Sequence, residues 1–139
     1  DKWYPKGEKI VMREYKFDIH NEMYVAIPEE KEKFCLALSD SLEVINEELT
    51  PSYKAKLDHL LDQSSVWYPK ALEKIQEEFP ELAHARLLSI FILSEQTDID
   101  LIFGLEFGLR EDSEHGRGLK FSLDSFEILE YGLGEVAYY

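Results

Sequence analysis

The clearest pattern in the chain is an alternation of apolar and other side chains over residues 99–109. Every odd position in this stretch is isoleucine, leucine or phenylalanine, whereas the even positions include charged residues and two glycines. Successive side chains of a β-strand point to opposite faces, so the stretch predicts a long strand with one buried face. A polar loop with two glycines follows at 111–118, and the alternation resumes over 119–123. The two runs predict a β-hairpin whose odd face belongs to the core.

The remainder of the second half also predicts strands and turns. Residues 87–93 are apolar on both parities apart from one serine, which is typical of a strand covered on both faces. Polar residues at 95–98 predict a turn into the hairpin. A last strand is expected at 126–131, followed by a glycine-bearing turn at 132–134 and a short apolar end at 136–139. This half of the chain should form an antiparallel meander.

Two helices are predicted before the meander. Thr50 is suited to cap a helix and Pro51 to occupy its first position, and an amphipathic pattern continues to about Gln63. The serine pair at 64–65 predicts the cap of a second helix, which Pro80 ends. The short join between the helices predicts that they lie antiparallel to each other.

The N-terminal third predicts a β-hairpin. Residues 9–17 mix apolar and charged side chains and indicate a weak strand, and Met23–Ile27 has the β-branched and aromatic content of a stronger one. Alternation at Phe34–Leu38 predicts a returning strand. An alternative remains open here, because apolar residues over 34–49 also fit a helical period.

These elements predict a single α+β domain over residues 1–139. Its antiparallel meander sheet packs against the two helices, and a β-hairpin stands at the N-terminus. The helices should cover the odd face of the meander sheet, and its even face should be open to solvent. Gly104 and Gly108 lie on that even face, where a strand glycine often marks a bulge or the close approach of another backbone. The charged residues of the even face are Asp100, Glu106, Arg110 and Lys120.

The chain is strongly acidic, with a formal net charge of −14 and an isoelectric point of about 4.6. Such a surface repels nucleic acids and anionic membranes, so we expect neither as a direct partner. It favours a basic protein partner, although high solubility alone would also account for it. Residues 94–139 carry a net charge of −8, compared with −6 for the longer segment before them, so negative charge is denser in the second half.

Cys35 is the only cysteine, so the chain offers no internal disulfide. Its apolar neighbours favour a small buried side chain over a nucleophile. No run reaches the length of about 18 apolar residues that a membrane span needs, and the first residues lack the apolar stretch of a signal peptide. We therefore expect a cytoplasmic protein.

The polar loop of the hairpin raises the question of catalysis. Asp112, Glu114 and His115 are residue types that bind metals or transfer protons. However, no second histidine lies at ligand spacing, and patterns such as HExxH, GxSxG or GxGxxG are absent from the sequence. We expect no cofactor and no metal, and a structural or partner-contacting loop rather than an enzyme.

The same loop carries a resemblance. The stretch Asp-x-Glu-His-Gly-x-Gly, its flanking strands and a closing Tyr-Gly step resemble a family of small bacterial domains of uncharacterised function. The helical part, from the threonine–proline start to a phenylalanine–proline end where the family usually has tyrosine–proline, is also similar. The similarity covers roughly residues 45–135. The matching motif residues are Asp112, Glu114, His115, Gly116, Gly118, Tyr131 and Gly132.

Members of this family are often encoded beside polymorphic or contact-dependent toxins, so the resemblance implies an immunity protein. With the acidic charge, it leads us to expect a protein that binds a cognate toxin domain, a basic nuclease, and occludes it with carboxylates in place of phosphates. One alternative is a metal- or ligand-dependent enzyme centred on the loop acids and histidine, and another is an interaction module with no toxin. The expected partner-binding residues are Asp100, Glu106, Arg110, Asp112, Glu114 and His115.

Overall fold

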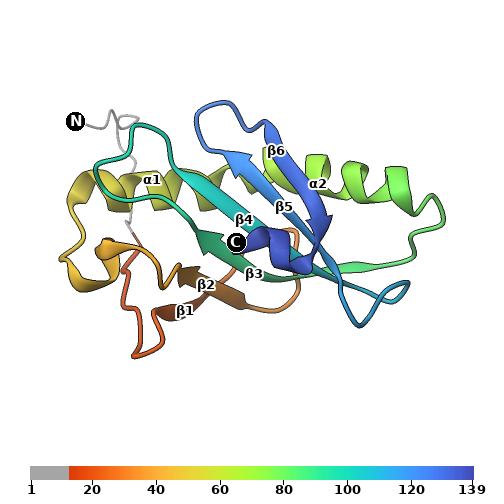
Figure 1. The fold of residues 1–139 in the computed structure, drawn as a ribbon, viewed down its shortest axis with the longest axis horizontal. Helices are drawn as coiled ribbons and strands as arrows, with labels where there is room; N and C mark the ends of the chain where they lie inside the picture. The colour runs from red at the N-terminus through yellow and green to blue at the C-terminus, as the bar shows by residue number, and fades with distance from the viewer. Residues whose placement is uncertain (1–12) are drawn as a thin grey trace, which may run out of the picture.

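The computed structural model describes residues 13–139, which form a six-stranded sheet and two helices (Figure 1). Two short 3₁₀ turns, η1 and η2, complete the secondary structure. In chain order the elements are β1 (Glu22–Val25), β2 (Phe34–Leu38), η1 (Glu43–Asn46), α1 (Pro51–Asp62), α2 (Ser64–Glu78), β3 (Ala85–Ile92), β4 (Ile102–Leu109), β5 (Arg117–Ser122), β6 (Ile128–Leu133) and η2 (Gly134–Ala137).

The strands lie side by side in chain order, from β1 at one edge to β6 at the other. All neighbours are antiparallel except β2 and β3, which run parallel because η1, α1 and α2 carry the chain back between them. The predicted α+β class, the C-terminal meander and the N-terminal hairpin are confirmed. The helical alternative for 34–49 is wrong over β2, whose residues pair with β1 and β3.

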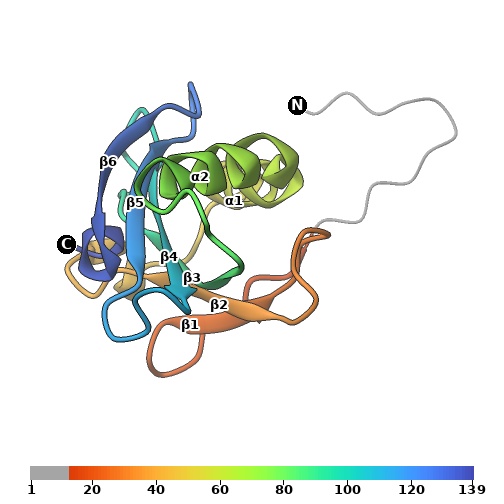
Figure 2. The same ribbon diagram turned by 90° about the vertical axis from the view of Figure 1, so that its right-hand side faces the viewer.

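The helices begin and end close to the predicted residues, but their arrangement differs from the prediction. The Thr50 hydroxyl accepts a hydrogen bond from the Tyr53 N–H at 3.2 Å and caps α1 as expected. A single residue, Gln63, joins α1 to α2. Its N–H donates to the carbonyl of His59, and its own carbonyl accepts hydrogen bonds from the N–H groups of Val66 and Trp67. The chain therefore continues forward with the helices end to end (Figures 1 and 2), so the antiparallel prediction is wrong. Ser64 does not cap α2, because its hydroxyl donates to Glu29 at 2.7 Å.

The core lies between the helices and one face of the sheet, which bends around them (Figure 2). The odd residues of β4 point into this core, as the alternation predicted. Trp67 packs edge-on against Phe103 with ring centroids 6.0 Å apart, and Tyr68 packs in the same way against Phe107 at 5.8 Å. These contacts place α2 directly over the centre of the sheet.

A β-bulge, rather than burial of both faces, accounts for the apolar residues at both odd and even positions of β3. The pairing with β4 shifts between Leu87 and Ser89, so one extra residue is accommodated in β3. Before the bulge the core-facing positions are Ala85 and Leu87, and after it they are Ile90 and Ile92. The other side of β3, with Phe91, remains half-exposed.

The sheet face opposite the helices, called the back face below, is only partly open, contrary to the prediction. Turn η2 lies across β4 and β5 on this side. A Cβ atom built on Gly104 would be 1.8 Å from the carbonyl oxygen of Ala137, so only glycine fits beneath the turn. The predicted close approach of a second backbone is therefore confirmed at Gly104. At Gly108 the nearest atoms belong to the Leu88 side chain instead.

Several boundaries also differ from the prediction. Ile99 is 92% exposed and precedes β4, which begins at Ile102, so the first part of the alternating stretch is a loop. Residues 13–17 form no strand, and the rest of the weak strand proposed for 9–17 lies outside the described residues. Gly132 belongs to β6 rather than to a turn.

Candidate partner-binding site

The loop between β4 and β5 has a fixed shape. Gly116 adopts a φ of +65°, and a Cβ atom there would lie 2.3 Å from the carbonyl oxygen of Phe107. Its N–H donates to the carbonyl of Asp112 at 2.9 Å, which closes the turn. Glycine at this position therefore gives the loop a conformation that another residue would strain.

Arg117, the first residue of β5, ties the loop to the end of α2. Its side chain points to the helix-covered side, and the residue is only 7% exposed. The Nε and Nη2 atoms donate to the two carboxylate oxygens of Glu78, both at 2.8 Å, and Nη1 donates to Asp112 at 2.7 Å. The guanidinium carbon also lies 4.8 Å from the ring centroid of Phe79. Bidentate, charge-assisted bonds of this kind are strong and directional.

The same contacts perturb the carboxyl groups. Hydrogen bonds from Arg117, and then from the Tyr131 hydroxyl at 2.6 Å, lower the pKa of Glu78 to about 2. Arg117 and then His115 lower the pKa of Asp112 to about 2. Both carboxylates are therefore ionised at neutral pH and hold the cation between them.

His115 is held by the loop rather than free in it. Its backbone N–H donates to Asp112 at 3.2 Å, and its Nδ1 atom lies 3.1 Å from the same carboxylate oxygen. Its carbonyl accepts the N–H of Gly134, at the start of η2. Nearby, Arg110 and Glu114 are exposed, and neither side chain makes a hydrogen bond or ion pair with the part of the chain that the structure describes. Within residues 13–139 no group of three or more His, Cys, Asp and Glu side chains is arranged to hold a metal ion.

Glu106 is half-buried in the middle of the back face. It pairs in register with Ser89 on β3 and Gly118 on β5, and a Cβ on Gly134 would lie 3.3 Å from its carboxylate. Partial burial raises the pKa of Glu106. No described residue bonds to its carboxylate, so the desolvation is uncompensated there.

Asp100 lies apart from the other predicted residues. Its carboxylate accepts bonds from the Ser122 hydroxyl and the Asp124 N–H, which ties the start of β4 to the end of β5. The eight residues of β4, about 26 Å of strand, separate it from the loop. The structure therefore brings Glu106 together with the loop residues, through Gly134, but not with Asp100.

Sequence reasoning missed the network around Arg117. Its position supplied a signal, because Arg117 shares the odd parity of Leu119 and Phe121 and had to enter the covered side of the sheet. A buried guanidinium needs carboxylate partners. The partner Glu78 lies far away in the sequence, so its identity was not visible there.

Cys35 is half-exposed on the back face rather than buried, which corrects the expectation. Its pKa is raised to about 11, first by burial and then by Glu22 and Asp18. The thiolate form that reacts as a nucleophile is therefore disfavoured.

Comparison of the chain with protein-family models, with curated proteins and with solved structures gave no match. Neither of the helices in the described part of the chain has both the length and the apolar character needed to cross a membrane.

Proposed function

We propose that this protein is a cytoplasmic immunity protein that binds a basic toxin domain, with a nuclease as the expected target, and occludes it. Glu106 carries the proposal. Its carboxylate lies half-buried at the centre of the back face without a cation from residues 13–139. Such a carboxylate costs folding stability unless a positive charge reaches it, and a lysine or arginine of a partner would supply that charge.

The overall charge supports the same partner. A net charge of −14 steers basic proteins toward this chain and speeds their encounter. Arg110 and Glu114 stand exposed on a loop that Gly116 and Arg117 hold in shape, so they offer prearranged charges at the end of β4, the strand that carries Glu106. The resemblance of this loop to a family encoded beside toxins agrees with the proposal. Asp100 and Asp112, whose carboxylates are engaged within the fold, are expected to act through the structure rather than by direct contact.

A metal- or ligand-dependent enzyme centred on Asp112, Glu114 and His115 has less support. Both Asp112 carboxylate oxygens already accept hydrogen bonds, from Arg117 and from His115. We expect added Zn²⁺ or Mn²⁺ to leave the melting temperature unchanged. A metal-dependent rise that the His115→Ala substitution removes would favour the enzyme.

The proposal predicts that a neighbouring gene encodes the toxin domain, and the test uses that domain. Co-expression should protect the host cell from growth arrest. In stopped-flow binding at low salt, Glu106→Gln and Glu114→Lys should each lower the association rate by about tenfold, with a weaker dependence on salt. Glu73→Lys is the control and should leave the association rate nearly unchanged, because Glu73 is an exposed acid on α2 rather than on the back face.

Two outcomes would count against the proposal. Failure of the wild-type protein to bind or protect would remove the immunity function. Loss of binding in Glu73→Lys alone would keep that function but move the inhibitory surface to the exposed side of the helices.

A further inference from the structure

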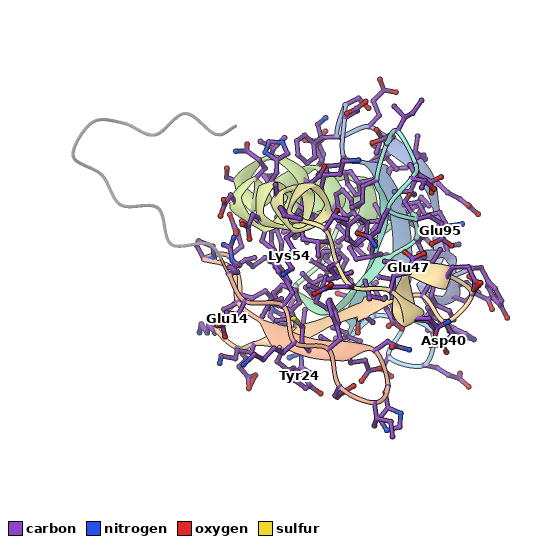
Figure 3. The ribbon with its side chains drawn as sticks, turned by 90° about the vertical axis from the view of Figure 1, so that its left-hand side faces the viewer. Glu14, Tyr24, Asp40, Glu47, Lys54 and Glu95 are labelled. Carbon is purple, nitrogen blue, oxygen red and sulfur yellow. The ribbon has the colours of Figure 1, made fainter. Side chains whose placement is uncertain are left out.

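The back face contains a hollow of about 810 Å³ between the first three strands and the end of the chain. Figure 1 shows the C-terminal residues beside β3, and Figure 3 labels Asp40, in the loop that follows β2. The residues on which the argument depends are Ile19, Glu22, Asp40, Phe91, Tyr138 and Tyr139, all of which line the hollow. We call it the back-face hollow.

Several of the apolar and aromatic side chains that line the back-face hollow are exposed to solvent. Ile19 is 90% exposed, Tyr139 79% and Tyr138 44%. Tyr24, another exposed tyrosine, points away from the helices on neighbouring β1 (Figure 3). A gathering of exposed large apolar side chains on one face is typical of an interaction surface.

The tyrosines are held in place. Tyr138 packs against Phe91 with ring centroids 5.1 Å apart, and Tyr139 follows at 5.6 Å from Tyr138. Lys120 donates to the backbone oxygen of Tyr139 at 2.6 Å, and the N–H groups of both tyrosines donate to the carbonyl of Glu135 at 3.2 Å. Rings that are ordered before binding lose less conformational entropy when a partner docks.

The charge of the back-face hollow is negative. Its lining includes the carboxylates of Glu22 and Asp40 but no lysine or arginine. Neither carboxylate makes a hydrogen bond or ion pair with another side chain or backbone group in residues 13–139. This contrasts with Glu77, Glu78 and Asp62 on the helices, each of which pairs with a nearby lysine or arginine.

We propose that the back-face hollow binds an arginine-bearing segment of the basic partner protein, with the guanidinium stacked on a tyrosine ring and paired to Glu22 or Asp40. Arginine fits better than lysine because its planar group both stacks on aromatic faces and binds carboxylates with two parallel hydrogen bonds. That the partner is a basic protein rests on the proposed function.

The first test needs no toxin. The probes are acetylated, amidated tetra-arginine and tetra-lysine peptides, titrated against the whole protein and followed by NMR. Tetra-arginine should bind more tightly and shift the resonances of Tyr138 and Tyr139. Glu22→Gln/Asp40→Asn should weaken its binding by about tenfold, as expected when charge-assisted bonds are lost.

Matched controls separate the hollow from general charge attraction. Glu73→Gln/Glu81→Gln removes the same charge from two exposed acids outside the hollow and should leave binding nearly unchanged. Tyr139→Ala should weaken binding, whereas Tyr24→Ala, at an exposed tyrosine outside the hollow, should not. Equal binding of both peptides, or equal losses in both double variants, would overturn the proposal.

The second test uses growth protection and separates the two proposals. If wild-type protein protects and Glu22→Gln/Asp40→Asn protects equally well, the hollow is not the contact, although the immunity function stands. If wild-type protein does not protect while tetra-arginine still binds selectively, the immunity function fails and the arginine site remains.

Discussion

Arg117 and Glu78 are joined by two parallel hydrogen bonds of 2.8 Å, between the start of β5 and the last turn of α2. The contact couples the loop between β4 and β5 to the helical layer. We expect the loop to lose its shape when this contact is removed, even though the loop itself is unchanged.

Replacement of Arg117 by methionine tests the coupling. The substitution keeps a long side chain against Phe79 but removes four hydrogen bonds, two of them to Glu78. Because Glu78 is partly exposed, water compensates some of the loss, and we expect the free energy of unfolding to fall by about 1.5–3 kcal/mol. Urea denaturation measures it. The control Arg86→Met, at an exposed ion pair of 3.8 Å, should cost less than about 1 kcal/mol.

The same contact predicts a loss of stability in acid. The folded pKa values of Glu78 and Asp112 are about 2, below their ordinary values of 4.5 and 3.8. Between these limits the unfolded chain binds more protons than the folded one, so acid favours unfolding. Stability from this network should be fully present above pH 4.5 and disappear toward pH 2. In Arg117→Met, urea midpoints measured from pH 6 to pH 3 should decline less steeply.

Glu106 predicts the opposite pH dependence. Burial raises the folded pKa of its carboxyl above 4.5, so the fold disfavours the charged form. The penalty should appear as the pH rises through the folded pKa and should be absent well below it. Glu106→Gln is therefore expected to raise the melting temperature at pH 7 and to leave it unchanged near pH 3.5. A variant that is less stable at pH 7 would show that the carboxylate serves the fold.

Gly104 supports the position of η2. A methyl group there would collide with the Ala137 carbonyl, which is backbone and cannot rotate away. Gly104→Ala should displace the turn, cost about 1–3 kcal/mol and increase hydrogen exchange at the Tyr138 amide. Gly108→Ala meets only the flexible Leu88 side chain at 3.3 Å, so it should cost clearly less.

Phe103 tests the core. It stacks on Phe121 at 5.5 Å and contacts Trp67, and it is fully buried. Phe103→Ala should reduce the free energy of unfolding by about 3–5 kcal/mol. Ile99→Ala serves as the control, because the exposed side chain of Ile99 should contribute little. A small effect at Phe103 would contradict the assignment of the helix-facing side as the core.

The core face of β4 could be predicted from the sequence, because a strand buried on one side alternates between apolar and other residues. The odd positions of this stretch are all apolar. The bulge at Leu88 could not be predicted, because β3 has apolar residues at both odd and even positions. The sequence therefore does not show where the core-facing positions change from odd to even. The junction at Gln63 was ambiguous for a related reason, because a single residue between helices suits continuation as well as reversal. Within the candidate site, the glycine-bearing loop around Gly116 could be recognised from the local sequence. The contacts of Arg117 with Glu78 and of Tyr138 with Phe91 depend on the tertiary fold and could not be predicted from the sequence.

The parallel pairing of β2 with β3 has a consequence for the order of assembly. Strands β3 to β6 join through short connections, so their contacts are local and close early in folding. β2 can join β3 only after residues 39–84 have folded back across the sheet, which carries a larger loop-closure entropy. We therefore expect the N-terminal hairpin to dock last and to open first, as a separate step in native-state hydrogen exchange. Ile19, Glu22 and Asp40 would leave with it, so the hollow would exist only in the completed fold.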